Sequence, residues 1–554
     1  MDDPRRLPLV YVRGFAGGTA GIDKAVGDPF YGFNEGSTHV RVGAHDQPLF
    51  HQFESPLLRL IREEGYELLV EGSQETYLAQ HARVPANSVW VHRFYDRSSS
   101  TWGGRPDEYR LERAAADLLD LVDRLRERTG APAVHLVAHS MGGLICRCLL
   151  QKVLPDRGRD AAECIGKFFT YGTPHGGIAF DLGGGWLERI RDAVGIQGAD
   201  IFGPRRMYAY LTPQAAFDPG GPPEGWDARR MPDGSGALPL ERVFCLVGTD
   251  PTDYDVALGL SSAAVGPHSD GLVQIERAYV PGAHRAYVHR SHSGRYGMVN
   301  SEEGYQNLRR FLFGDTRIEA SLVGYRLPGD DDLVWQAETR LSVRGLPVVM
   351  HERLAAHWCP VQLDRPTAGT EAGVPLASTF LNSGLRPAAD GPMRFILMLR
   401  LLSLREHRGI LSLGDHIERA ADFSDTLVID VGTPEGRARY LGRLELGDRG
   451  RHPRPRRRRD PTGRRGPRTR ALGRAHPAAR ERRPPGRRRR PDPARRHTVE
   501  LSGLASGSSP HRGAERTPRV VTPPPPTTAP RPAPSAARRP RGRPASGCGG
   551  RRGP

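Results

Sequence analysis

The sequence predicts an α/β protein whose first half forms a doubly wound, mostly parallel sheet. Two observations support this fold class. Short apolar runs alternate with helical patterns from residue 7 to about 314, and after residue 315 the helical patterns give way to strand-like runs. The strands expected in the first half are 8–12, 66–70, 88–95, 133–138, 165–171, 242–248 and 285–290.

Two helices of this half are the clearest. A helix at about 107–129 has one apolar face and ends at Gly130. Its apolar face consists of Leu111, Ala115, Leu118, Val122 and Leu125. A final helix at about 301–313 begins at Ser301 and ends before Gly314. Helices spaced in this way between strands favour parallel pairing of the strands.

Two insertions interrupt the alternation, at about 16–55 and at about 178–240. The second combines a helical piece, Trp186 to Val194, with Gly/Pro-rich loops. Long insertions of this composition are typical of an active-site lid. We therefore expect residues 1–315 to form a catalytic domain that carries lid insertions.

Residues 316–446 follow a different pattern, in which apolar and polar residues alternate with a period of two. Turn-rich segments separate the strand-like runs, which are 333–344, 346–352, 394–404, 425–431 and 438–446. This pattern predicts an all-β, sandwich-like accessory domain of about seven or eight strands. Its His, Asp and Glu residues fit ordinary solvated faces.

The net positive charge of the chain comes from residues 451–554. The formal net charge is +17, yet residues 1–450 sum to −8, because residues 451–554 hold 30 Arg, no Lys and only 5 acidic residues. This segment contains no Phe, Trp or Tyr, so it cannot bury enough apolar surface to offset its ordering entropy. We expect residues 447–554 to be a disordered Arg/Pro-rich tail.

Three interpretations of the tail are open: a solvated linker, a polyanion-binding arm, or a stretch read out of frame from a GC-rich gene. Without interleaved aromatic residues it predicts only non-specific attraction to polyanions, and no specific nucleic-acid partner. The six cysteines show no metal-ligand spacing, which favours buried free thiols in a reducing compartment. The first residues, Met1 to Arg6, lack the apolar core of a signal peptide, and no run approaches the ~20 apolar residues of a membrane span. The chain is therefore expected to be soluble and cytoplasmic, without a transmembrane segment, cofactor or metal.

Residues 137–143 read V-A-H-S-M-G-G, between an apolar strand and a helical stretch. A strand, a tight turn with serine at its apex and a helix form the arrangement of a nucleophile elbow. The turn needs very small residues two before and two after the serine, and Ala138 and Gly142 occupy those positions. The elbow predicts Ser140 as a nucleophile at a helix N-terminus, where the dipole favours a developing negative charge.

A serine nucleophile needs a histidine base and a carboxylate that orients the histidine. In a sheet that carries a nucleophile elbow, these three residues follow one another in the chain in the order serine, acid, histidine. Asp270 lies in a turn before an apolar run, and His292 follows the strand 285–290, so these two are the predicted acid and base. The alternatives that stay open are Asp250, Asp253 and Asp255 for the acid, and His284 and His289 for the base.

The oxyanion of an acyl-transfer intermediate needs backbone N–H donors. One donor is expected from Met141, the residue after the nucleophile, and the other from the turn after the first strand, where Phe15 follows Arg13-Gly14. A glycine-rich turn could also suggest a phosphate loop. The segment lacks the Lys-Ser/Thr of a P-loop and the spacing of a dinucleotide fingerprint.

Three motifs together carry a resemblance to a known family. A-H-S-M-G-G at 138–143, T-P-H-G-G at 173–177 and S-D-G-L-V at 269–273 resemble lipases and esterases of the α/β-hydrolase superfamily, most closely bacterial true lipases and inositol-deacylase-like lipases. Over residues 7–314 the resemblance implies an eight-stranded core, an acyl-serine intermediate and hydrolysis of carboxylic esters. It assigns Ser140, Asp270 and His292 as the triad and Phe15 with Met141 as oxyanion donors. Arg13 stands where many lipases have histidine.

The sequence therefore predicts a serine hydrolase that cleaves carboxylic esters, with an ester or lipid-like small molecule as substrate. An acyltransferase or thioesterase with the same triad is the alternative among enzymes, and a non-catalytic hydrolase-like binding scaffold is the alternative outside catalysis. His175, in T-P-H-G-G, is interpreted as a structural residue that braces the loop beside the elbow.

Overall fold

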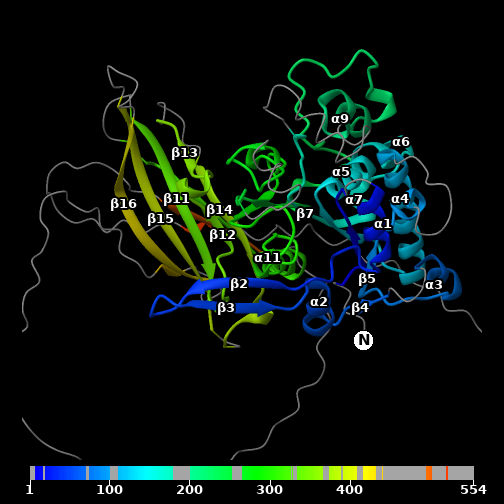
Figure 1. Ribbon diagram of the computed structural model, residues 1–554, viewed down its shortest axis with the longest axis horizontal. Helices are drawn as coiled ribbons and strands as arrows, with labels where there is room; N and C mark the ends of the chain where they lie inside the picture. The colour runs from blue at the N-terminus through cyan, green and yellow to red at the C-terminus, as the bar shows by residue number, and fades with distance from the viewer. Residues whose placement is uncertain are drawn as a thin grey trace, which may run out of the picture.

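A seven-stranded parallel sheet forms the centre of the first half of the chain (Figure 1). The computed structural model describes residues 6–15, 19–69, 74–99, 110–178, 200–252, 265–325, 327, 333–365, 373–388, 391–407, 416–431, 439–440, 495–501 and 520–521. In the order in which they lie, the strands are β4 (Glu67–Leu68), β5 (Ser88–Val91), β1 (Leu9–Val12), β6 (Val134–His139), β7 (Ile165–Tyr171), β8 (Val243–Gly248) and β9 (His284–Val288). Every neighbouring pair is parallel.

Helices cover both faces of this sheet, which is why strands such as β1, β5 and β8 are continuous buried apolar runs. The helices are α1 (Thr19–Gly27), α2 (Pro56–Glu64), α3 (Gln74–Gln80), α4 (Leu111–Thr129), α5 (Met141–Cys148), α6 (Leu154–Asp156), α7 (Ala161–Cys164), α9 (Pro204–Leu211) and α11 (Glu302–Phe313). A π-helical turn, Leu149–Val153, joins α5 to α6. On one face α4 packs beside α5; on the other, α2 and α11 are joined by ion pairs of Arg309 with Glu63 (2.5 Å) and Glu64 (2.6 Å).

The α/β fold predicted from the alternation of strands and helices is confirmed. Each of the seven predicted strands corresponds to a strand of the sheet. The two predicted helices correspond to α4, which ends at Gly130 with a φ of 68°, and α11, which the Ser301 side chain caps by accepting from Gly304 N–H. The helical piece expected from Trp186 to Val194 lies outside the described residues.

The eighth strand implied by the family resemblance does not appear in the described sheet. Residues 16–55 instead contain an antiparallel hairpin, β2 (Ser37–Val42) and β3 (Pro48–Phe53), whose strands pair only with each other in the described part of the chain. The described parallel sheet therefore has seven strands.

The second half forms two sheets that pack face to face. One has the order β12-β11-β15-β16-β17, with β13 also paired to β11, and the other has the order β14-β10-β18-β19. The strands are β10 (Thr316–Leu322), β11 (Val334–Val343), β12 (His351–Arg353), β13 (Val361–Leu363), β14 (Val374–Leu381), β15 (Met393–His407), β16 (His416–Val431), β17 (Arg439–Tyr440), β18 (Arg495–Leu501) and β19 (Val520–Val521). Ile318 and Leu376 of one sheet share a buried core with Trp335 and Leu399 of the other, which confirms the sandwich-like architecture.

Two of these strands, β18 and β19, belong to the Arg-rich tail. β18 pairs in parallel with β10 over its whole length. The rest of the tail, for which the sequence predicts disorder, lies outside the described residues.

The sandwich packs against the edge of the parallel sheet at β9 and against α11 (Figure 1). Ser378 Oγ donates to the carbonyl of Arg285 (3.3 Å), and Asn307 Nδ2 donates to the carbonyl of Met350 (2.9 Å). Phe380 of β14 joins the hydrophobic core of the parallel sheet. In the described part of the chain, no helix is both long and apolar enough to span a membrane.

Candidate active site

Ser140 occupies a strained turn between β6 and α5. Its φ of 54° and ψ of −129° lie in a region that residues with a side chain rarely adopt. Ser140 N–H donates to the carbonyl of Tyr171 (2.9 Å), and Thr173 Oγ1 donates to the carbonyl of Ser140 (2.9 Å), so β7 and the loop after it hold the turn. A Cβ at Gly142 would lie 2.3 Å from the Val12 carbonyl oxygen, which explains the glycine there.

The structure brings Ser140, His292 and Asp270 into one chain of hydrogen bonds. His292 Nε2 lies 2.9 Å from Ser140 Oγ, and His292 Nδ1 lies 2.8 Å from Asp270 Oδ2. The three residues are 4 %, 2 % and 0 % exposed, respectively. Because the three side chains are buried, water does not compete for these hydrogen bonds.

Backbone amides orient the carboxylate of Asp270. Its Oδ1 accepts from the N–H groups of Val273 (2.8 Å) and Leu272 (3.1 Å), which leaves Oδ2 facing His292. The N–H of His292 also donates to the carbonyl of Asp270 (2.8 Å). An ionised carboxylate can only accept, so in a neutral imidazole the proton lies on Nδ1, and Nε2 is the nitrogen that accepts from Ser140.

The alternative acids and bases lie elsewhere or outside the described residues. Asp250 Oδ1 accepts from Thr252 N–H (2.9 Å) and Thr252 Oγ1 (2.6 Å), so this carboxylate caps its own turn. Asp253 and Asp255 lie outside the described residues. His289 stacks on the ring of His357 at 3.7 Å, and His284 meets the ring of Phe380 edge-on at 4.9 Å.

The turn after β1 passes directly against Ser140. A Cβ at Gly14 would lie 2.5 Å from Ser140 Cβ and 3.2 Å from Ser140 Oγ, so Phe15, the next residue, follows a backbone in contact with the serine. Met141 is the first residue of α5, where N–H groups have no intrahelical acceptor. Arg13 Nη1 donates to the carbonyl of Tyr31 (2.5 Å), and burial lowers the pKa of Arg13.

Two residues beside Asp270 and His292 were not identified from the sequence. Gly172, with a φ of 51°, lies where a Cβ would be 2.9 Å from Asp270 Oδ2 and 3.1 Å from His292 Nδ1. His139 Nε2 donates to the carbonyl of His292 (3.1 Å), and burial followed by the nearby His292 holds the pKa of His139 well below its usual range. A glycine directly after β7 was the available signal for the first; nothing local marks the second.

A buried arginine supports the loop that contains T-P-H-G-G. Arg147 of α5 has no exposed surface and donates to the carbonyls of His175 (3.0 Å) and Arg230 (2.9 Å) and to Gln151 Oε1 (2.7 Å). Burial lowers the pKa of Arg147 to about 10. His175 Nε2 lies 3.2 Å from Thr170 Oγ1, away from the triad, in keeping with a structural role.

The sandwich contacts the loop that carries Asp270. The ring of Trp358 stacks on His268 at a centroid distance of 4.7 Å. Cys359 packs in one buried cluster with Val273 and Ile275. The segment on both sides of Asp270 is therefore packed against the second half of the chain.

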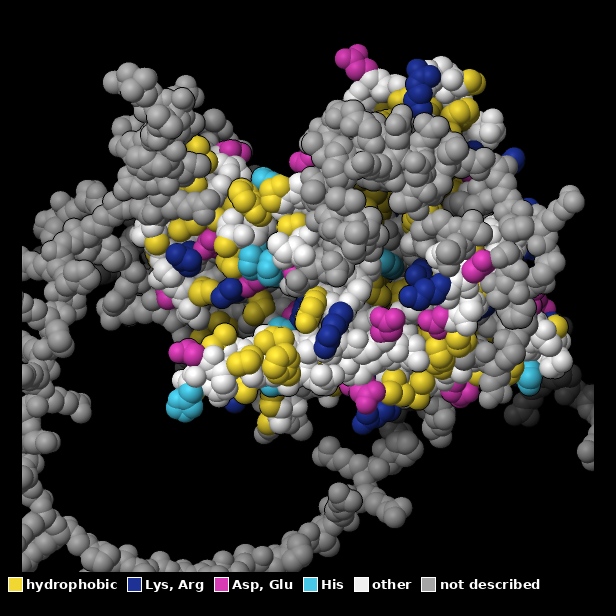
Figure 2. Space-filling model, in the orientation of Figure 1, with side chains coloured by type: hydrophobic (Ala, Val, Ile, Leu, Met, Phe, Trp, Pro, Cys, Tyr) yellow, Lys and Arg dark blue, Asp and Glu magenta, His cyan; other side chains and the backbone are white. Residues whose placement is uncertain are grey.

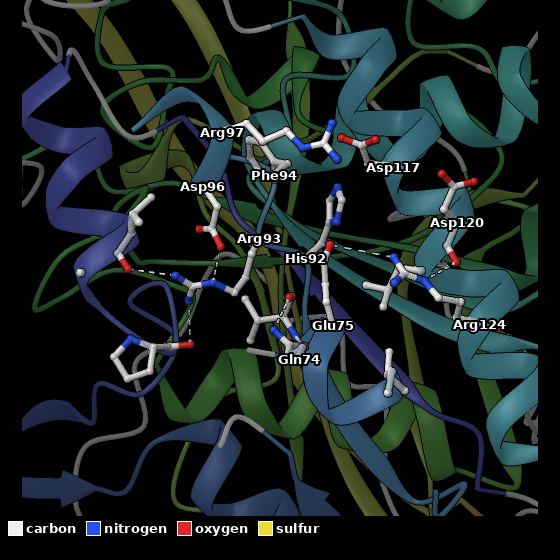
Figure 3. Close-up of a pocket in the computed structure, with 16 residues that line it drawn as sticks. Gln74, Glu75, His92, Arg93, Phe94, Asp96, Arg97, Asp117, Asp120 and Arg124 are labelled. Carbon is white, nitrogen blue, oxygen red and sulfur yellow. Dashed lines mark hydrogen bonds and ion pairs between the residues drawn. The ribbon is translucent and has the colours of Figure 1, made fainter. Parts of the chain in front are cut away.

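A cavity of about 780 Å³ lies at a different place, at the carboxyl end of β5 between α1, α3 and α4 (Figure 3). Its labelled side chains are mostly charged or polar, and Arg93 Nε donates to Asp96 Oδ2 (2.9 Å). Ser140, Asp270 and His292 do not line this cavity. Within the described residues, no group of three or more His, Cys, Asp or Glu side chains could hold a metal ion. The chain of hydrogen bonds at Ser140 therefore defines the candidate site.

Residues 92–159, which contain the elbow, match the family model described as the alpha/beta hydrolase fold. With the parallel sheet and its order of strands, this match confirms the resemblance to the α/β-hydrolase superfamily. A comparison with curated proteins gives no match.

Among solved structures, the chain is similar to the mature form of the lipase BlEst2 from Bacillus licheniformis (15 % identity, TM-score 0.31, 56 % of this chain and 93 % of that chain). It is also similar to the product of the gene lin2722 from Listeria innocua (14 % identity, TM-score 0.24, 55 % and 94 %). A third is lipase B from Aspergillus fumigatus (10 % identity, TM-score 0.26, 55 % and 52 %).

Proposed function

We propose that this protein is a serine hydrolase that cleaves carboxylic esters, with Ser140 as nucleophile, His292 as base and Asp270 as the orienting acid. The observation that carries the proposal is the hydrogen-bonded chain from Ser140 Oγ through both nitrogens of His292 to Asp270 Oδ2, at 2.9 Å and 2.8 Å. A serine whose hydroxyl faces a histidine, which in turn faces a buried carboxylate, is equipped for acyl transfer.

In the first half-reaction, Ser140 Oγ attacks the ester carbonyl carbon while His292 Nε2 takes the hydroxyl proton. The tetrahedral intermediate carries its negative charge on the former carbonyl oxygen, which accepts hydrogen bonds from the N–H groups of Phe15 and Met141. Asp270 stabilises the imidazolium. The carbon–oxygen bond to the alcohol then breaks, and the alcohol leaves with the proton from His292 Nε2.

In the second half-reaction, His292 takes a proton from water, and the resulting hydroxide attacks the acyl-serine carbonyl. Collapse of this second intermediate breaks the bond to Ser140 Oγ, which recovers its proton from His292, and the carboxylic acid is released. An acyltransferase or a thioesterase would use the same triad with another acceptor or leaving group. We favour a lipid-like ester on the three motifs that resemble lipases.

The test combines covalent labelling with hydrolysis. Wild type should react with a fluorophosphonate probe and hydrolyse p-nitrophenyl esters, and Ser140→Ala should lose the label and at least about 10⁴-fold in kcat. Ser342→Ala, at a half-buried serine of β11, is the matched control and should behave as wild type. An unlabelled wild type would refute the proposal in favour of a binding scaffold. Labelling of Ser140→Ala at the wild-type rate would refute Ser140 as the nucleophile. Esters and thioesters of graded chain length, with and without an alcohol acceptor, separate the three enzyme classes.

A further inference from the structure

The β2–β3 hairpin, residues 37–53, holds more of the exposed large hydrophobic side chains than any other element of the described chain. Nine large hydrophobic side chains are exposed among the described residues, and four of them belong to this hairpin: Val40, Val42, Leu49 and Phe50. Phe50 is 63 % exposed and Val42 is 77 % exposed. Figure 2 shows hydrophobic side chains gathered over β2 and β3. Such a cluster on a surface usually marks a site of interaction.

The two faces of the hairpin differ in chemistry. Val40 lies opposite Phe50 and Val42 opposite Pro48, and residues directly opposite each other point to the same face, so these four form one apolar face. The other face carries the paired His39 and His51 together with Arg41, which is paired with Leu49. Neither strand contains an acidic residue; the acid of the hairpin, Asp46, lies in its turn.

This apolar face is exposed to solvent in the structure. From Val40 to Gln52 the residues are exposed apart from Gly43, which is half-buried. A two-stranded hairpin without a sheet or helix behind it is only marginally stable in water, so a surface that covers its apolar face would stabilise it.

An apolar face, backed by a face that carries the positive charge of Arg41 and no acidic side chain, matches a lipid surface. Amphipathic elements of this kind lie at the boundary between headgroups and acyl chains, and basic side chains add attraction to anionic headgroups. The hairpin is also fixed to the segment of the catalytic base: Arg290 Nη2 donates to His39 Nδ1 (2.5 Å), and His39 Nδ1 lies 3.4 Å from Glu303 Oε1. Arg290 is two residues from His292.

We propose that the hairpin docks the protein on a lipid surface, with Val40, Val42, Pro48 and Phe50 inserted at the headgroup boundary. The choice of lipid rests in part on the proposed ester hydrolase function. The docked hairpin fixes the orientation of the attached His292 segment relative to the lipid layer, so that ester lipids of that layer become the substrate.

The test measures binding and hydrolysis separately. Flotation with phosphatidylcholine vesicles, with and without phosphatidylglycerol, is performed in the Ser140→Ala background, so that binding does not depend on turnover. The double substitution Val42→Ser and Phe50→Ser should weaken vesicle binding about tenfold or more, because serine does not supply the free energy gained when an apolar side chain leaves water. Val334→Ser with Leu385→Ser removes two exposed hydrophobic residues elsewhere and should leave binding unchanged.

Hydrolysis of a water-soluble p-nitrophenyl ester should be equal in the hairpin variant and wild type, while hydrolysis of the same acyl ester in vesicles should fall with binding. Failure of the Ser140→Ala protein to float with either vesicle would overturn the docking proposal, even if the wild type hydrolyses soluble esters. Equal binding by the hairpin variant would overturn it as well. A concentration-dependent dimer that the hairpin substitutions dissociate, without vesicle binding, would assign the face to a second copy instead. Vesicle binding without hydrolysis of any ester would leave docking intact and refute the proposed catalytic function.

Discussion

Replacement of Gly14 by alanine should block the site without a change in any polar group. The new Cβ would lie 2.5 Å from Ser140 Cβ and 2.9 Å from the His139 carbonyl oxygen. Carbon atoms in contact prefer separations of about 3.5–4.0 Å, so the turn after β1 and the nucleophile must move apart by roughly 1 Å. A displacement of about 1 Å at the reacting group costs on the order of 10²-fold in rate.

We therefore expect kcat/KM of Gly14→Ala for a soluble p-nitrophenyl ester to fall about 100-fold, and its fluorophosphonate labelling to slow in parallel. Overpacking of this kind also costs about 1–3 kcal/mol of unfolding free energy, which urea denaturation measures. Gly27→Ala is the matched control, since a Cβ there meets nothing within 4 Å. If folded Gly14→Ala is labelled at the wild-type rate, the close approach of the turn after β1 to Ser140 is refuted.

Three further outcomes follow from contacts of the described residues. Asp270→Asn should retain the fold and lose about 10³–10⁴-fold in kcat, because an amide no longer fixes the tautomer of His292. Asp117→Asn is the control, and a loss of kcat in Asp270→Asn no larger than in this control would contradict the role of Asp270. Arg147→Leu should lower the unfolding free energy by about 2–4 kcal/mol in urea, because the buried carbonyl of His175 loses its donor, while Arg157→Leu on the surface should change little. His92 is buried and its pKa is lowered to about 4, so the unfolded chain binds the proton first and stability is lost as pH falls from about 6.5 towards 4. Between pH 7 and pH 5 this amounts to about 2 kcal/mol, which denaturation of His92→Gln should recover; an unchanged pH dependence would show that His92 is not the group responsible.

Much of the fold could be predicted because its signals are local. The parallel strands are short apolar runs that any window of the sequence reveals, and Ala138 and Gly142 around Ser140 reflect a steric requirement of one turn. Ser140, Asp270 and His292 each follow a strand, and their order in the chain indicated that they meet at one edge of the sheet. These predictions needed no knowledge of contacts between distant segments.

The remaining features depend on contacts that sequence alone does not encode locally. Arg147 reads as an ordinary helical arginine, and only the tertiary structure shows that it is fully buried against the carbonyls of another loop. His139 and Gly172 acquire their importance because β6, β7 and the loop of His292 meet. The pairing of β18 with β10 joins residues more than 170 positions apart, in a segment whose composition predicts no structure at all.

The contact of the sandwich with β9 also bears on solubility during folding. β9 is the last strand of the parallel sheet, and an uncovered edge strand offers unpaired backbone groups to any other chain. β12 and β14 pack against it, and Ser378 satisfies the carbonyl of Arg285. Until the second half of the chain has been synthesised and has docked, this edge is a template for intermolecular strand pairing, so expression of residues 1–315 alone should yield aggregates where the longer chain does not.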